Sequence, residues 1–115
     1  MEHQADVIIV GTGVAGLFCA LQLPKELHIL MITKDKAEHS DSYLAQGGIS
    51  TLRTPEDYES YFEDTMRAGH YKNNPDSVDV MIRSSPQIIQ NLIDFGVEFE
   101  RTSDGLSYTR EGAHS

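Results

Sequence analysis

The pattern of apolar positions in the first third of the chain predicts a strand, a helix and a second strand. Residues 6–10 are a β-branched run, typical of a strand buried on both faces of a sheet. A glycine-rich turn follows, and residues 17–23 then suit a short buried helix that stops at Pro24. Residues 28–33 are a second apolar run of strand length. Together they predict a βαβ unit with parallel strands and a right-handed crossover.

Residues 34–55 are polar and contain glycine, which predicts a long loop. Such a loop is uncommon in a compact domain unless it binds something. Thr54-Pro55 then gives a helix N-cap followed by proline at the first helical position. Apolar residues recur at helical spacing after it and predict an amphipathic helix over residues 55–68.

The same cap-then-proline signal recurs at Asn74-Pro75 and Ser85-Pro86 and predicts two consecutive short helices. Gly96 has the position of a C-cap glycine for the second of them. Residues 97–99 and 106–108 are expected to pair as a small hairpin.

The predicted fold class is α/β: the first βαβ unit of a doubly wound, Rossmann-like nucleotide-binding domain with helical additions. A sheet of that kind needs at least four or five parallel strands, and only two are visible, so we expect it to be incomplete. We interpret residues 1–115 as one N-terminal part of a longer domain, without an internal linker or repeat.

Composition narrows the function. The formal net charge of −9 argues against a nucleic-acid partner and against docking on anionic lipid. The longest apolar stretches, 14–23 and 29–32, fall short of the ~20 residues that span a bilayer. The N-terminus has no signal-peptide pattern, and Cys19 is the single cysteine, so no intrachain disulfide forms. We expect a cytoplasmic protein with no membrane partner and no metal site.

Gly11, Gly13 and Gly16 match the G-x-G-x-x-G fingerprint of dinucleotide binding. The first glycine allows a tight turn, the second lets the backbone approach a pyrophosphate, and the third lets helix and strand pack closely. The motif lies between a predicted strand and a predicted helix, which is the context that it requires. The alternative is a glycine turn that only packs.

The end of the second predicted strand departs from the NAD-binding pattern. An acidic residue is expected there to accept hydrogen bonds from a ribose, but Thr33 and Lys34 occupy the position. An ammonium only donates hydrogen bonds, so Lys34 cannot replace that acid. It either contacts acceptors of an adenosine or is a solvated surface lysine.

Several blocks carry a family resemblance in order along nearly the whole chain. They are Gly11–Leu17, Thr33-Lys34, Ser42–Ile49, Glu63–Thr65 with Ala68-Gly69, Phe95–Val97 and Thr109–Ser115. Together they resemble the N-terminal part of the L-aspartate oxidase family, within the flavoprotein superfamily of fumarate reductase and succinate dehydrogenase. The Ala-Gln-Gly-Gly-Ile and Arg-Glu-Gly-Ala-His-Ser blocks are the specific ones.

The resemblance implies FAD as cofactor. It places the pyrophosphate on the turn 12–15, the adenosine near Lys34, and the riboflavin and isoalloxazine along residues 41–48. Ser42 and Gln46 are expected at the carbonyl and nitrogen edge of the flavin, and Gly47-Gly48 where the ring lies flat, unless these glycines form only a flexible turn. The implied FAD-binding residues are Gly11, Thr12, Gly13, Val14, Ala15, Gly16, Lys34, Asp41, Ser42, Tyr43, Leu44, Ala45, Gln46, Gly47 and Gly48.

The resemblance also separates two branches of the superfamily. Succinate dehydrogenases attach FAD to a histidine five residues before the glutamine, and here that position is Asp41. His39 is displaced by two residues, so we expect non-covalent FAD.

Glu111 and His114 follow the aspartate oxidase pattern, whereas succinate dehydrogenases carry an aromatic residue and a glutamine there. A carboxylate beside a dicarboxylate substrate is repulsive unless it faces a cation, and L-aspartate has an ammonium. We therefore expect Glu111 to orient the substrate amine. Pairing of Glu111 with Arg110 or Arg101 in a solvated hairpin is the alternative.

The implied reaction is oxidation of L-aspartate to iminoaspartate, with hydride passing to the flavin and oxygen or fumarate as the final acceptor. It is the first step of the quinolinate branch of NAD biosynthesis, and the product is expected to pass to quinolinate synthase. The alternatives are a soluble fumarate reductase or succinate dehydrogenase flavoprotein, or a non-catalytic nucleotide-binding module if the chain ends at residue 115. No residue besides Glu111 is assigned a role toward the substrate, and the fragment alone is expected to be inactive and to bind FAD weakly.

Overall fold

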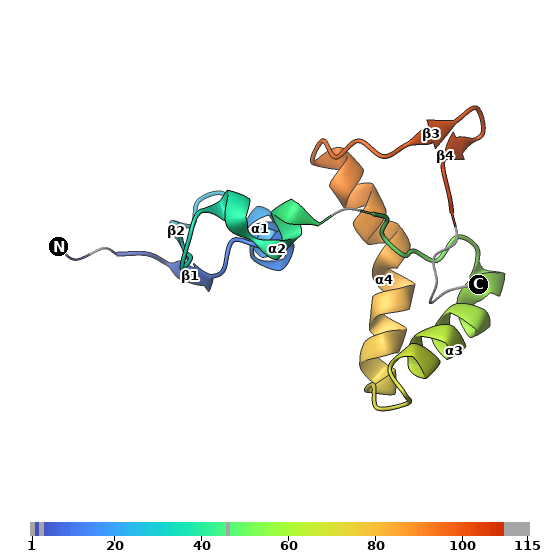
Figure 1. The fold of residues 1–115 in the computed structure, drawn as a ribbon. Coiled ribbons are helices and arrows are strands. Elements are labelled where there is room, and N and C mark those ends of the chain that lie inside the picture. The colour runs from blue at the N-terminus through green and yellow to red at the C-terminus, as the bar shows by residue number, and fades with distance from the viewer. Residues whose placement is uncertain (1, 3, 46, 110–115) are drawn as a thin grey trace. The chain divides into compact units, whose positions relative to one another are not determined.

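The computed structural model describes residues 2, 4–45 and 47–109. The chain divides into two compact units, residues 1–48 and residues 49–115, and each is described by itself. Figure 1 shows the strands β1 and β2 with α1 and α2 in the first unit, and the helices α3 and α4 in the second.

The first unit is the predicted βαβ arrangement. Strand β1 (Val7–Val10) pairs in parallel with strand β2 (Ile29–Ile32), and helix α1 (Val14–Gln22) is the crossover between them. The register places Val7 opposite Ile29. Beyond the strand ends, the Gly11 N–H donates to the Ile32 carbonyl at 2.7 Å, so the pairing continues into the glycine turn. Helix α1 begins inside the glycine motif, earlier than the apolar run alone suggested.

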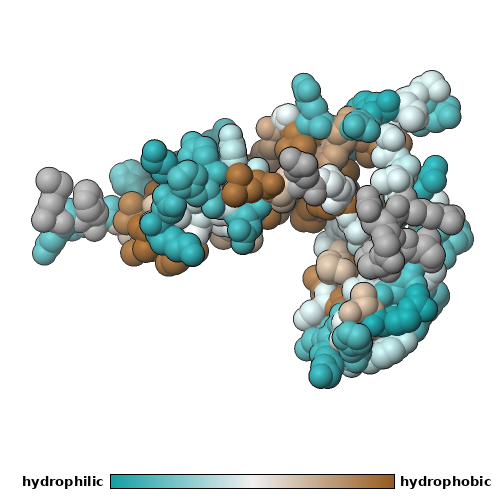
Figure 2. All heavy atoms as spheres, viewed as in Figure 1, coloured by the Kyte–Doolittle hydropathy of each residue, from teal (hydrophilic) through white to brown (hydrophobic). Residues whose placement is uncertain are grey.

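The two faces of β1 differ in exposure. Ile9 faces α1, because a Cβ built on Gly16 of that helix lies 3.3 Å from the Ile9 Cγ2. Ile8 and Val10 alternate to the other face and are 61% and 79% exposed. The expectation of a strand buried on both faces is therefore wrong for residues 1–48, since no described part of this unit covers the second face. Figure 2 shows hydrophobic side chains on the surface where β1 and β2 lie.

The predicted loop over residues 34–55 contains short helical turns. These are η1 (Ala37–His39), α2 (Asp41–Leu44) and the start of η2 (Pro55–Asp57). The Ser40 hydroxyl caps α2 by accepting the Tyr43 N–H at 3.2 Å. Thr54 and Asp57 form a capping box at η2, as the Thr54-Pro55 signal predicted.

The second unit has a small core between α3 (Tyr58–Ala68) and α4 (Pro75–Asp94). Tyr61 and Met66 of α3 are buried there against Val78 and Ile82 of α4. Ile82 has no exposed surface. The amphipathic helix predicted up to residue 68 is confirmed.

The prediction of two helices divided at Ser85-Pro86 is wrong, because α4 runs continuously through Pro86. Proline has no N–H for the Ile82 carbonyl, four residues earlier. The Ser85 hydroxyl donates to that carbonyl at 2.6 Å and also accepts the Leu52 N–H at 2.8 Å. Ser85 thus replaces the hydrogen bond that Pro86 removes, and it does not begin a new helix.

Helix α4 ends at the predicted C-cap glycine. Gly96 has a φ of 101°, its N–H donates to the Ile93 carbonyl, and the Val97 N–H donates to the Leu92 carbonyl. This is a Schellman motif. A hairpin of β3 (Arg101–Thr102) and β4 (Gly105–Leu106) follows, with shorter strands than predicted and without residues 97–99.

Within the described part of the chain, no helix combines the length and the apolar composition that crossing a membrane requires.

Candidate functional site

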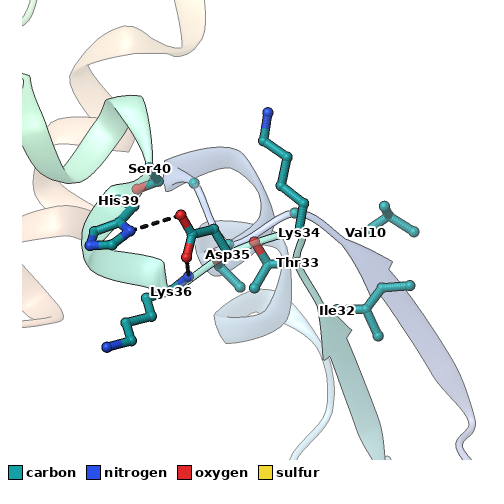
Figure 3. Close-up of a pocket in the computed structure, with 11 residues that line it drawn as sticks. Val10, Ile32, Thr33, Lys34, Asp35, Lys36, His39 and Ser40 are labelled. Atoms are coloured by element: carbon teal, nitrogen blue, oxygen red, sulfur yellow. Dashed lines mark hydrogen bonds and ion pairs between the residues drawn. The ribbon is translucent and has the colours of Figure 1, made fainter.

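An open cavity of about 470 Å³ lies at the carboxyl ends of β1 and β2 (Figure 3). Parallel sheets of this class bind ligands at that edge. The end of β1 and the glycine turn contribute residues 10–13, and the end of β2 and the following turn contribute residues 32–36, with His39 and Ser40. Val10 and Ile32 give the cavity an apolar part, and Lys34 and Lys36 carry positive charge beside it. This combination suits a ligand with both a ring and an anionic group.

The glycines of the motif differ in what they do. Gly11 has a φ of 111°, in the region that favours glycine, and forms the turn out of β1. A Cβ on Gly16 would lie 2.2 Å from the Gly11 carbonyl oxygen, so this glycine permits the close packing of α1 on the turn. A Cβ on Gly13 would lie 3.2 Å from the Ser42 Oγ, so Gly13 lets the Ser42 hydroxyl approach the N-terminus of α1 closely.

Ser42 connects the glycine motif to the segment 41–48. Its Oγ accepts the Val14 N–H, the first amide of α1, at 3.0 Å. Gly13 is the N-cap residue of α1 and has no side chain that could make this bond. The structure therefore brings together two stretches of the chain that the sequence assigned to one cofactor, by a contact that the sequence did not predict.

Asp35 is held beside the cavity by two hydrogen bonds (Figure 3). Its carboxylate accepts from the His39 Nδ1 at 2.8 Å and from the Lys36 N–H at 2.7 Å. These bonds, that from His39 foremost, lower the pKa of Asp35. The acidic residue that follows β2 is thus engaged by the protein, and the Asp-His spacing of four residues is the sequence signal for the pair.

Lys34, which the family resemblance places near the adenosine of FAD, lines the cavity. The Thr12 hydroxyl oxygen is enclosed and has no hydrogen-bond partner among the described residues.

The segment 41–48 is only partly described. Gly47 has a φ of 123°, and a Cβ on Gly47 or Gly48 would meet nothing within 4 Å. Tyr43 and Leu44 are exposed on α2. Gln46 and the substrate-orienting candidate Glu111, with residues 110–115, lie outside the described residues. Among the residues that are described, His, Cys, Asp and Glu form no group of three or more suited to a metal ion.

The residues present fit FAD on structural grounds. The cavity reaches Gly13 at the N-terminus of α1, where an anion such as a pyrophosphate is favoured, and Lys34 and Lys36 line the same cavity. Gly13 and Ala15 would hold the pyrophosphate through backbone N–H groups, beside the Val14 N–H that Ser42 accepts, and Lys34 would lie on the adenosine side.

Comparison with known proteins agrees with FAD as the cofactor. The sequence profile of the FAD binding domain family matches residues 6–115. The chain is 50% identical over 116 aligned residues to "L-aspartate oxidase" of Clostridium acetobutylicum, covering 100% of this chain and 27% of that protein. It is 40% identical to "L-aspartate oxidase, chloroplastic" of Arabidopsis thaliana, covering 96% of this chain and 17% of that one.

Among solved structures, this chain is similar to one protein chain of the structure "Mycobacterium smegmatis Sdh1 in complex with UQ1". The TM-score is 0.86 and the identity 28%, covering 98% of this chain and 20% of that one. The chain thus spans about a quarter or less of the length of these relatives, 27% in the Clostridium acetobutylicum protein.

Proposed function

The chain belongs to the FAD binding domain family, and from that premise we propose that it is the cofactor-binding N-terminal part of an L-aspartate oxidase. One observation carries the proposal: 50% identity to an L-aspartate oxidase over the whole chain. The cofactor that the family indicates is FAD.

FAD, when bound, supplies the two-electron acceptor for oxidation of the substrate amine. This chain binds and orients the cofactor. The N–H groups at the start of α1 would hold the pyrophosphate and Lys34 would lie by the adenosine. Gly47 and Gly48, where an added Cβ would meet nothing within 4 Å, would leave space for the flavin ring.

We propose that Glu111 recognises the ammonium of L-aspartate. A carboxylate attracts that ammonium but repels the two carboxylates of succinate or fumarate. In the complete protein, Glu111→Gln is expected to raise the KM for L-aspartate. It is also expected to reduce the preference of the enzyme for L-aspartate over succinate. Unchanged discrimination between the two would exclude this role.

We also propose that FAD is bound non-covalently, because an aspartate carboxylate at position 41 cannot make the histidyl bond of succinate dehydrogenases. Acid precipitation tests this directly. A yellow supernatant over a colourless pellet is expected, and a yellow pellet would contradict it.

A dicarboxylate oxidoreductase is the second candidate, favoured by the similarity to the Sdh1 structure. Anaerobic bleaching of the flavin separates the two, with L-aspartate and succinate added in turn to the complete protein. Bleaching by L-aspartate alone is expected, and iminoaspartate would then be available to quinolinate synthase. Bleaching by succinate alone would assign the protein to the other branch.

A further inference from the structure

We propose that Arg53 and Tyr108 are positioning residues, whose stacked side chains hold the chain segment that carries Glu111. The inference rests on the role of Glu111 in the proposed function and adds two residues for which the sequence suggested no such role. The Arg53 guanidinium carbon lies 4.7 Å from the centre of the Tyr108 ring, which is a cation–π contact. Glu111 follows Tyr108 after two further residues.

The backbone at Arg53 is held on both sides. The preceding Leu52 donates its N–H to the Ser85 Oγ at 2.8 Å, and its side chain packs against the core between α3 and α4. The following Thr54 donates its N–H to the Asp57 carboxylate at 3.1 Å, within the capping box of η2. The guanidinium therefore extends from a fixed point of the second unit.

The Arg53 guanidinium is directed at an aromatic ring and not at a carboxylate. Among the described residues, Arg53 takes part in no hydrogen bond or ion pair, so the face of the Tyr108 ring is its partner. That face carries negative partial charge, which attracts the cation. Both side chains are exposed, so removing either one leaves no buried charge without a partner. The contact can thus be broken by substitution without unfolding the core.

Tyr108 is the residue at which the chain that leaves the β3–β4 hairpin is held. The Ser107 N–H donates to the Glu100 carbonyl at 2.8 Å, which continues the strand pairing as far as Ser107. The stack with Arg53 then holds the next residue beside the segment that precedes η2. Three residues of chain span at most about 11 Å, so this contact limits the space that the backbone of Glu111 can reach.

Holding this segment in place favours recognition of the substrate ammonium. A carboxylate on a mobile segment must be ordered when the substrate binds, and that ordering costs conformational entropy. Exposed cation–π contacts are weak, so loss of the stack should raise the KM for L-aspartate by a factor of about 2–5. The kcat should stay unchanged, because the contact supports binding of the ground state and the transition state alike.

Steady-state kinetics of the complete protein test the inference, with L-aspartate as substrate and succinate as a competing dicarboxylate. Tyr108→Leu and Arg53→Gln should each raise the KM for L-aspartate by the same factor. The inhibition constant of succinate should not rise, because succinate has no ammonium. Tyr108→Phe keeps the ring and should retain the KM of the wild type. The double variant should be no worse than either single variant, because both substitutions remove one contact.

Arg83→Gln is the matched control. The Arg83 guanidinium carbon lies 4.3 Å from the centre of the Tyr58 ring, in a second contact of the same kind between α4 and α3. Loss of this stack removes an arginine from the surface of the same unit, but Tyr58 is remote from Glu111 along the chain. The KM for L-aspartate should therefore stay unchanged in this variant.

Three results would overturn the inference. They are an unchanged KM in both Tyr108→Leu and Arg53→Gln, an equal rise in Tyr108→Phe, and a rise of the succinate inhibition constant by the same factor as the KM. A wild-type protein that oxidises L-aspartate while its variants give one of these results would retain the proposed function. A wild-type protein that does not oxidise L-aspartate would refute the proposed function, and this inference with it.

Discussion

Gly16→Ala is predicted to damage both the packing of the first unit and the cofactor site. The new Cβ would lie 2.2 Å from the Gly11 carbonyl oxygen, whereas carbon–oxygen contacts are about 3.3 Å or longer. Helix α1 must therefore move by about 1 Å. Overpacking of this kind costs about 1–3 kcal/mol, and the contact with rigid backbone puts it near the upper end. The better helix propensity of alanine offsets about 1 kcal/mol of this cost. The net loss in the free energy of unfolding is therefore about 2 kcal/mol.

Thermal unfolding of the complete apoprotein measures this loss. About 2 kcal/mol corresponds to a fall in apparent melting temperature of about 4–8 °C in a domain of roughly 200 residues. Gly48→Ala is the matched control, because its Cβ would meet nothing within 4 Å and its φ is not positive, so the apoprotein should be as stable as the wild type. An unchanged or raised melting temperature for Gly16→Ala would refute the argument from close packing.

Three further predictions concern single contacts. Ser85→Ala should cost about 1–3 kcal/mol of unfolding free energy in denaturant titrations, because a backbone carbonyl and an N–H lose their partner, whereas Ser84→Ala should cost under about 0.5 kcal/mol. Gly96→Ala should cost about 1–2 kcal/mol from its positive φ, and Gly96→Asn clearly less; equal costs would contradict this. Because the pKa of Asp35 is lowered in the fold, its hydrogen bond to His39 stabilises the fold at pH values above the ordinary carboxyl pKa, and this stabilisation is lost as the pH falls through the lowered pKa. In the variant His39→Ala, an NMR titration should show the Asp35 carboxyl titrating at a higher pH than in the wild type.

The βαβ unit could be predicted because its signals are local. Strand-length apolar runs, a glycine turn between them and Pro24 after the helix each act within a few residues, and the structure confirms all of them. The α3 side of the core in the second unit could be predicted in the same way, from apolar residues at helical spacing. A hairpin was predicted in this part of the chain, but its first strand was placed too early, at residues 97–99, and the pairing is between residues 101–102 and 105–106.

Ser85-Pro86 shows where local reasoning fails. The same dipeptide pattern begins a helix at Thr54-Pro55 and lies inside one at Pro86. The difference is the Leu52 N–H, 33 residues away, which binds the Ser85 Oγ and holds it within the fold. Periodicity contains no information about such a partner.

Ser42 illustrates the same limit at the candidate site. It lies 28 residues from Val14, so no spacing rule predicted that its hydroxyl caps α1. The sequence did place both residues in one cofactor site, through the resemblance of the whole block 41–48. The sequence could thus assign both residues to one expected site, but it could not predict the hydrogen bond that joins them.

The exposure of Val10 and Ile32 links the fold to the binding of the cofactor. Both residues end a strand, both line the cavity, and both leave much of their apolar surface to solvent. Apolar surface of this kind contributes to affinity only when a ligand or further protein removes it from water. A cavity open on one side encloses a ligand incompletely, and sites that bind cofactors tightly bury most of the ligand surface. We therefore expect residues 1–115 alone to bind FAD weakly, and FAD fluorescence quenched by an equimolar amount of this fragment at micromolar concentration would contradict that expectation.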